Sequence, residues 1–148
     1  MKPETRQRMD WVPIFNLTPG MQAHERIENS VQNGTPDYTY TLDGINGWIE
    51  FKVHKPLKDP LKKIGSLRHW SGLQREWMRA RYLSPTVFLF LRVGAWDFIL
   101  DTRNMFNVEE MRYQDMLDSS ILKVDMSRKE DLNLLDLRRK LRGDRHGN

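Results

Sequence analysis

The 148-residue chain contains no cysteine, and this absence excludes several kinds of chemistry. It rules out disulfide bonds, zinc sites built on cysteine and a thiol nucleophile. The four histidines, His24, His54, His69 and His146, show no ligand spacing such as His-x-x-x-His. A metal ion would therefore depend on carboxylate oxygens, and oxygen ligands favour magnesium or manganese.

Long apolar runs are absent as well. The longest run, Val87 to Leu91, has the length of a strand, whereas a membrane-spanning helix needs about 20 apolar residues. The N-terminal residues Met1 to Arg6 are not followed by the apolar segment of a secretory signal. We therefore expect a cytoplasmic protein with no membrane partner.

Positive charge is in modest excess, with a net charge of +4 and a pI near 9.5. Such a balance suits a polyanionic partner. The cations gather in two groups, Lys52, Lys55, Lys58, Lys62 and Lys63 in the first, and Arg138, Arg139, Lys140, Arg142 and Arg145 in the second. Each group is able to hold phosphates, and each is equally compatible with a solvated surface.

The chain is expected to form one domain, residues 1–148, with a mixed α/β fold around one central sheet. Asp43-Gly44 predicts a hairpin turn between two strands. The first expected elements are an irregular segment at 1–20, a short helix at 21–31 and strands at 38–42 and 47–53. A helix at 67–82 and strands at 86–93 and 96–100 follow. The last elements are an irregular helix at 105–117 and a C-terminal segment at 128–148, which consists of a helix at 128–141 and a basic tail.

The first hairpin carries three charged side chains that are able to form a site. Pro36-Asp37 precedes the first strand, and Glu50 and Lys52 lie on the second. With a four-residue loop at 43–46, Asp37 would lie opposite Lys52, and all three side chains would share one face. Asp37 and Glu50 would then be about 5–8 Å apart, a span that one cation can bridge. The alternative is a surface hairpin with ordinary cross-strand ion pairs.

The opposite face of this hairpin is expected to serve the core, through Tyr40, Ile49 and Phe51. On the helix at 67–82, Trp70 and Trp77 are interpreted as core residues rather than base-stacking platforms. His54 is interpreted either as a residue near the site face or as a structural residue. Asp97 and Asp101 are interpreted as edge charges.

The order of these motifs resembles the PD-(D/E)xK nuclease superfamily. The stretch from Glu28 to Asp37, followed by Gly47-Trp48-Ile49-Glu50-Phe51-Lys52, is similar to the VRR-NUC and Holliday-junction-resolvase-like nucleases, many of them phage-encoded. Their pattern is an acid on a helix, Gly-x-Pro-Asp, an acid-x-Lys strand and a later helical glutamine, here Gln74. The resemblance covers about residues 25–100 and implies a restriction-endonuclease-like single domain.

This resemblance implies a role for each matching residue. The implied metal ligands are Asp37, Glu50, Glu28 and the backbone carbonyl of Phe51. Glu28 is favoured for the helical acid by its spacing from Asp37, and Glu25 is the alternative. Lys52 would be the catalytic lysine, and Gln74 would form a hydrogen bond near the lysine or the phosphate.

The implied activity is Mg²⁺-dependent cleavage of DNA phosphodiesters by water, with Mn²⁺ able to substitute. The substrate would be branched or duplex DNA. The more specific expectation is a four-way junction, whose symmetry favours a homodimer. A phage-encoded enzyme would act in the host cytoplasm. The residues expected to contact DNA are Lys55, Lys62, Lys63, Arg68 and Arg75. The alternatives are a catalytically inactive DNA-binding or regulatory module on a nuclease-like fold, and an RNA-directed nuclease.

Overall fold

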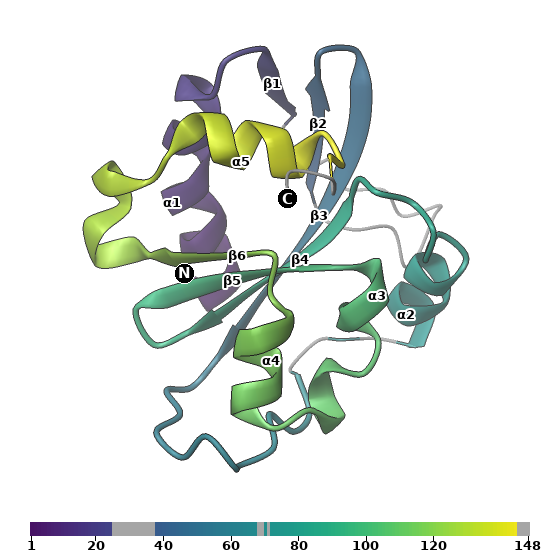
Figure 1. Cartoon of the computed structure of the whole chain (residues 1–148), viewed down its shortest axis with the longest axis vertical. Coiled ribbons are helices and arrows are strands. Elements are labelled where there is room, and N and C mark those ends of the chain that lie inside the picture. The colour runs from purple at the N-terminus through teal and green to yellow at the C-terminus, as the bar shows by residue number, and fades with distance from the viewer. Residues whose placement is uncertain (25–37, 68–69, 71, 145–148) are drawn as a thin grey trace.

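The computed structural model describes residues 1–24, 38–67, 70 and 72–144, and every structural statement concerns these residues. Six strands form one sheet in the order β1-β2-β3-β4-β5-β6 (Figure 1). The strands are β1 (Met21–His24), β2 (Tyr38–Leu42), β3 (Ile45–His54), β4 (Val87–Val93), β5 (Trp96–Asp101) and β6 (Leu122–Asp125). Because β3 and β4 run parallel and their neighbours run antiparallel, the sheet is mixed, which confirms the expected α/β class.

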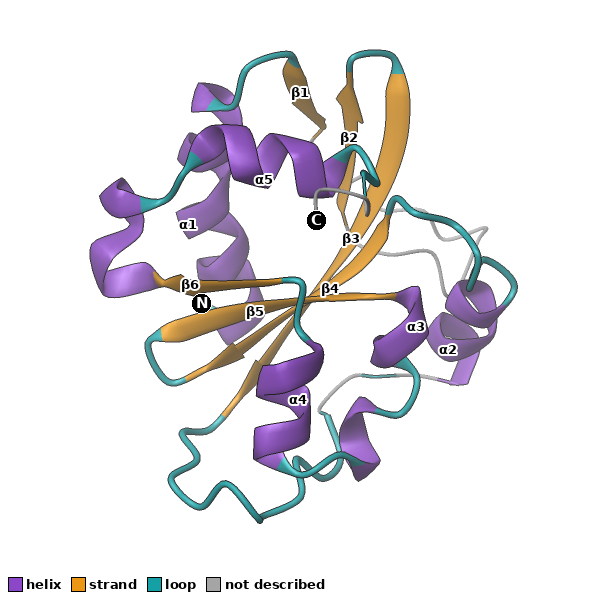
Figure 2. Cartoon of the chain, in the orientation of Figure 1, coloured by secondary structure: helices purple, strands orange, loops and turns teal. Residues whose placement is uncertain are grey.

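Helices cover both faces of this sheet (Figure 2). The helical elements are α1 (Pro3–Leu17), α2 (Gly72–Arg79), α3 (Thr102–Met105), η1 (Val108–Glu110), α4 (Tyr113–Ser119), η2 (Met126–Asp131) and α5 (Leu134–Leu141). Helices α1 and α5 pack on one face, whereas α2, α3 and α4 pack on the other. None of these helices is both long and apolar enough to cross a membrane.

Two apolar clusters lie on the two faces because side chains alternate along each strand. One cluster joins Trp11 and Phe15 of α1 to Phe51 and Phe90. The other joins helical residues such as Met78 to the next residues along β4, for example Leu89. Strand β4 is therefore buried on both sides, which explains its continuous apolar sequence.

The N-terminal region differs from the prediction. Residues 3–17 form α1 instead of an irregular segment, because Pro3 suits the first turn and Trp11, Ile14 and Phe15 are buried on the sheet. Pro13 lies inside this helix, so burial of its neighbours outweighs the local breaker signal. The helix expected at 21–31 is wrong for residues 21–24, which pair with β2 as strand β1, and residues 25–31 lie outside the described part.

The later helices are shorter than expected. Helix α2 begins at Gly72 rather than residue 67, although Leu67 and Trp70 are buried beside it. The helix expected at 128–141 is divided, because Asn133 caps α5 through hydrogen bonds from the backbone N–H groups of Leu135 and Asp136. Strand β6, with only four residues, was not predicted.

The hairpin of β2 and β3 forms as expected but with a tighter turn. Leu42 pairs with Ile45, so the loop is Asp43-Gly44, and both residues have positive φ (51° and 81°) as in type I′ turns. The expected four-residue loop is wrong, and Thr39 pairs with Trp48 instead of Glu50. The register moves by two residues, which changes the partners but keeps every side chain on its expected face.

Candidate functional site

Strand β3 places a carboxylate and an amine side by side inside the protein. Glu50 is 0% exposed and Lys52 is 3% exposed, and the Lys52 Nζ lies 3.3 Å from Glu50 Oε2. Both side chains point toward the α2 side of the sheet, because Ile49 and Phe51 point into the opposite core. Their pairing partners on the neighbouring strand β4 are Leu89 and Leu91, so the ion pair lies beside apolar side chains.

Helix α2 brings a third polar group to this pair. The Gln74 amide donates from Nε2 to Glu50 Oε1 at 3.0 Å. Lys52 Nζ in turn donates to Gln74 Oε1 at 3.5 Å. The three side chains therefore form a closed triangle, and the structure brings together three of the residues that the sequence grouped as a site.

Trp70 closes the triangle from one side. Its ring centroid lies 5.7 Å from Lys52 Nζ, and the side chain is buried, as the sequence analysis expected. This contact is a cation–π interaction, which is stronger where water is excluded. Trp77 differs from Trp70, because it is only half-buried and meets Trp48 edge to face at 5.7 Å.

The other expected metal ligands lie outside the described residues, namely Asp37, Glu28 and the alternative Glu25. Asp37 directly precedes Tyr38, which pairs with Ile49, the neighbour of Glu50. Within the described ranges, no group of three or more histidine and acidic side chains could hold a metal ion. Glu50 and the carbonyl of Phe51 are oxygen donors of the kind that suits Mg²⁺, and together they fall short of a complete ligand set.

The expected DNA-contacting cations have different environments. Lys55, Lys62 and Lys63 are exposed on the segment after β3. Arg75 forms an ion pair with Glu109 and is only 40% exposed, and Arg68 lies outside the described part.

The basic C-terminal group is largely paired with acids. Arg138 and Arg142 both contact Asp43 in the hairpin turn, and Arg139 contacts Asp136. These ion pairs reduce the local positive charge, so this group is a weaker phosphate site than its sequence suggests.

His54 has a structural role in the fold. Its Nδ1 lies 2.6 Å from the carbonyl oxygen of Lys55, and its Nε2 lies 2.7 Å from that of Ile64. The ring therefore ties the end of β3 to the segment that leads to α2. Of the two roles considered for His54, these contacts favour the structural one.

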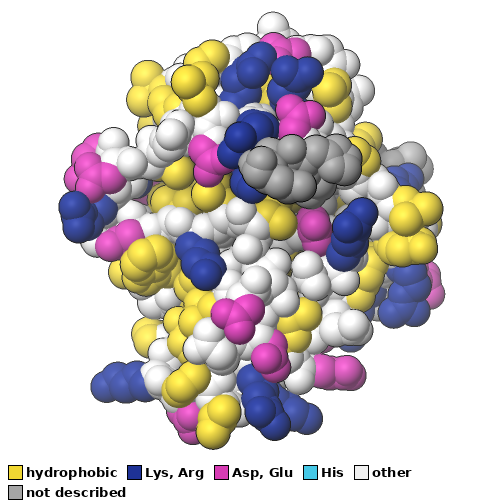
Figure 3. Space-filling model, in the orientation of Figure 1, with side chains coloured by type: hydrophobic (Ala, Val, Ile, Leu, Met, Phe, Trp, Pro, Cys, Tyr) yellow, Lys and Arg dark blue, Asp and Glu magenta, His cyan; other side chains and the backbone are white. Residues whose placement is uncertain are grey.

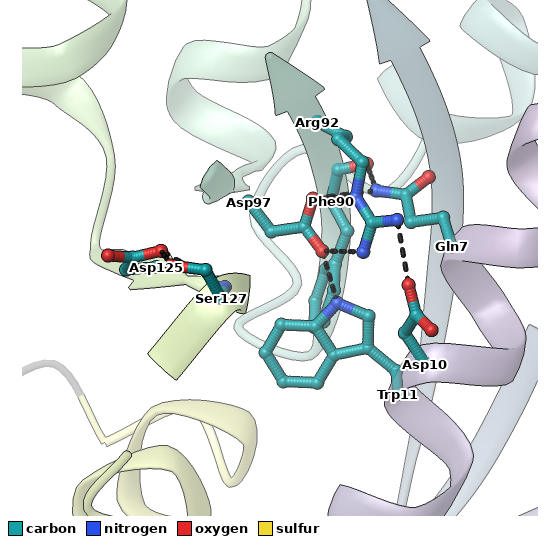
Figure 4. A network of polar contacts seen from close by, with 8 residues as sticks. All are labelled: Gln7, Asp10, Trp11, Phe90, Arg92, Asp97, Asp125 and Ser127. Atoms are coloured by element: carbon teal, nitrogen blue, oxygen red, sulfur yellow. Dashed lines mark hydrogen bonds and ion pairs between the residues drawn. The ribbon is translucent and has the colours of Figure 1, made fainter. Parts of the chain in front are cut away.

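A second polar network, which the sequence analysis missed, lies on the opposite face of the sheet (Figure 4). Asp97 is 0% exposed and accepts hydrogen bonds from Arg92 Nε and Nη2, at 2.8 and 2.9 Å, and from the Trp11 indole. Gln7 donates to the carbonyl of Phe90 at 3.0 Å. The network fastens α1 to the β4–β5 hairpin, so the interpretation of Asp97 as an edge charge is wrong.

Burial lowers the pKa of Arg92, but hydrogen bonds and charge from Asp97 and Asp10 outweigh it and raise this pKa above its ordinary value. The sequence contains one signal for the ion pair of Arg92 with Asp97, namely their spacing across the Gly94 turn, which places them opposite each other.

Asp101 is also buried rather than an edge charge, and its side chain caps α3 by accepting a hydrogen bond from the N–H of Arg103.

Comparison of the chain with protein-family models, with curated proteins and with solved structures finds no match. Glu50, Lys52 and Gln74 are therefore the residues from which a function has to be inferred. A buried carboxylate, amine and amide within hydrogen-bonding distance can hold a hard cation or bind a phosphate oxygen.

Proposed function

We propose that this protein is a Mg²⁺-dependent endonuclease of the PD-(D/E)xK type that hydrolyses DNA phosphodiesters. The observation that carries the proposal is the triangle of Glu50, Lys52 and Gln74. A buried ion pair adds little to stability, because desolvation offsets much of the attraction between its charges. Its presence on the central strand is better explained by chemistry, since functional sites gather buried ionisable groups.

The chain offers oxygen ligands for one divalent ion beside β3. Glu50 and the carbonyl of Phe51 would hold it together with Asp37 and one further acid, Glu28 or the alternative Glu25. When bound, Mg²⁺ or Mn²⁺ would polarise the phosphate and lower the pKa of a bound water. The pairing of β2 with β3 supports this set, because Asp37 directly precedes Tyr38, the residue that pairs with Ile49.

The protein's own groups would position the scissile phosphate. Lys52 would donate from Nζ to a non-bridging phosphate oxygen and stabilise the negative charge that develops there. Gln74 would hold the amine through its Oε1, and Trp70 would keep water away from it. Because these groups stand on a central strand and a packed helix, they need little rearrangement when the substrate binds.

Cleavage of labelled duplex, flap and four-way-junction DNA, with Mg²⁺ and with EDTA, tests this proposal. We expect metal-dependent cleavage that falls by about 10²–10³-fold in Glu50→Gln and in Lys52→Met. The controls are Glu110→Gln and Lys129→Met, which change the same charges at exposed positions that have no expected role in the site or in DNA contact. Thermal unfolding of each variant separates loss of chemistry from loss of fold.

One observation favours a second candidate, a catalytically inactive DNA-binding or regulatory module on a nuclease-like fold. Glu50 already contacts both Lys52 and Gln74, and among the described residues no group of three or more acidic or histidine side chains forms a metal site around it. Binding without cleavage on every DNA substrate would support the module and contradict the enzyme. The same assay on RNA distinguishes an RNA-directed nuclease.

A junction-resolving activity is the more specific form of the proposal. It adds a restriction-endonuclease-like arrangement to the proposal, and it favours a two-fold symmetric homodimer, because a four-way junction has two-fold symmetry. Preference for the junction over the flap, together with a dimer in sedimentation, would support it.

A further inference from the structure

An ordered stack of aromatic and cationic side chains stands beside the triangle. The guanidinium carbon of Arg81 lies 3.7 Å from the centroid of the Trp77 ring. Arg81 Nη1 also donates to the carbonyl oxygen of Trp77 at 3.0 Å, which holds the guanidinium in place. Trp77 in turn meets Trp48 edge to face. The stack therefore runs from β3 outward to the exposed Arg81.

The stack is anchored on the elements that carry the triangle. Trp48 and Glu50 point to the same face of β3, two residues apart, which is about 6.6 Å along a strand. Trp77 follows Gln74 by three residues of α2, which is about 4.5 Å along the helix axis. A ligand strand bound across Trp48 and Trp77 would therefore extend toward Glu50 and Lys52.

Three exposed arginines around this stack have no acidic partner within the described ranges. They are Arg79, Arg81 and Arg103. Six other arginines of the described ranges pair with carboxylates, namely Arg75, Arg92, Arg128, Arg138, Arg139 and Arg142, whereas Arg6, Arg8 and Arg112 form no such pair there. An unpaired cluster of this kind is complementary to phosphates, which bind guanidinium groups through charge-assisted hydrogen bonds.

Apolar surface is mixed with these cations. Tyr82 is 52% exposed and Leu83 is 76% exposed, and both border a small hollow that Arg103 also lines. Arg79 lies over the ring of Phe106, 5.8 Å from its centroid. Figure 3 shows hydrophobic and cationic side chains next to each other over α2 and the turn after it, at the right of the view.

We propose that Trp48, Trp77 and Arg81, with Arg79 and Arg103, form a platform for an unpaired segment of a nucleic-acid strand. Bases stack on aromatic rings and on guanidinium planes, whereas arginines hold the phosphates between them. A duplex hides the faces of its bases, so the platform favours single strands. Delivery of that strand to Glu50 and Lys52 rests on the proposed function, whereas binding to the platform does not.

Fluorescence anisotropy in EDTA tests the platform without any cleavage. The probe is a labelled oligothymidylate of about 12 nucleotides, within the site sizes of single-strand binders. We expect it to bind more tightly than a blunt duplex of equal length, and Arg81→Gln to weaken it about fivefold or more. An oligouridylate of equal length should bind similarly, because stacking does not read the 2′-hydroxyl.

Arg6→Gln is the matched control. Arg6 is an exposed helical arginine on α1, which packs on the opposite face of the sheet. The Arg6→Gln variant should leave the affinity for oligothymidylate unchanged. The Arg81→Gln variant should also reduce the slope of log affinity against log salt concentration by roughly 0.7. Equal losses in the two variants, or tighter binding of the duplex, would overturn the platform. So would competition by polyglutamate as strong as by unlabelled oligothymidylate.

Tryptophan fluorescence supplies a readout that charge alone does not affect. Base stacking should quench the emission of the wild-type protein, and Trp77→Phe should reduce this quenching. Absence of quenching on saturation would contradict stacking. If the Trp77→Phe variant does not fold, the affinity of the Arg81→Gln variant still tests the platform, because Arg81 is exposed. Single-strand binding without metal-dependent cleavage would keep the platform and reject the nuclease, and cleavage without selective binding would do the reverse.

Discussion

At the residue scale, the unusual feature is a charged pair in a place that an apolar pair could fill. Glu50 and Lys52 are buried on the central strand, with leucines opposite them on β4. Taking both charges out of water costs several kcal/mol each, and their attraction and the Gln74 amide recover only part of this. A protein selected for stability alone would do better with two apolar side chains here.

We therefore expect Lys52→Met to destabilise the protein by about 3–5 kcal/mol, because it leaves the Glu50 charge buried without the amine. The double variant Glu50→Gln/Lys52→Met removes both charges and should recover most of this loss while remaining inactive. Urea unfolding measures both changes. Full recovery of activity in the double variant would contradict a chemical role for the pair, and equal instability of both variants would contradict the desolvation argument.

The site residues also show how far the sequence alone could reach. Alternation along β3 fixed the shared face of Glu50 and Lys52, and this face survived the error in the turn because the register moved by two residues. The spacing of Arg92 and Asp97 predicts their pairing but not the burial of Asp97, which depends on Gln7 and Trp11, more than 80 residues away along the chain. Long-range contacts of this kind leave no local pattern.

At the element scale, helix α2 is short, and its position depends on η1. Glu109 of η1 accepts hydrogen bonds from the N–H of Leu67 and from Arg75, the residue after Gln74. The backbone N–H of Gly65 also donates to the carbonyl of Glu109, at 2.9 Å. These contacts, rather than local helix propensity, determine where α2 lies, so a helix predicted from residue 67 by periodicity alone was too long.

Glu109→Gln should therefore lower DNA cleavage although Glu109 does not touch the triangle, because Gln74 would be held less firmly. The Arg75–Glu109 coupling in a double-mutant cycle should be about 0.5–1 kcal/mol, since Arg75 is 40% exposed. Unfolding in urea and cleavage rates measure the two effects. The control is Glu110→Gln, an exposed acid one residue further on. Identical rates in the two variants would show that η1 does not position α2.

At the scale of the whole molecule, one face of the sheet stabilises the fold and the other carries the candidate functional groups. The α1 and α5 face is aromatic and cross-linked by the Asp97 network, whereas the other face carries the triangle and the stack. Because the raised pKa of Arg92 keeps it charged, its stabilising contribution is present at neutral pH and is lost only in strong alkali, above that pKa. The stabilising contribution of Arg92 should thus not change with pH around neutrality.

Helix α5 is part of the face that α1 and α5 cover, rather than part of a detachable basic tail. Leu137 and Leu141 are both fully buried, and the Tyr40 hydroxyl donates to the carbonyl oxygen of Leu141. Arg138 and Arg142 reach Asp43, so α5 fastens the turn of the hairpin that carries Glu50 and Lys52. A helix pattern in the sequence could give its apolar residues but not this docking site.

Two truncations separate these roles. Ending the chain after Leu137 should destabilise the protein by about 2–5 kcal/mol, because it removes the buried Leu141 side chain and leaves the Tyr40 hydroxyl without its acceptor. Ending it after Asp144 keeps α5 and its contacts with Asp43, so stability and the affinity for single-stranded DNA should stay close to wild type. Thermal unfolding and anisotropy measure both. A large loss of affinity in the longer truncated chain, with stability unchanged, would place the nucleic-acid surface at the C-terminus instead of at Trp77 and Arg81.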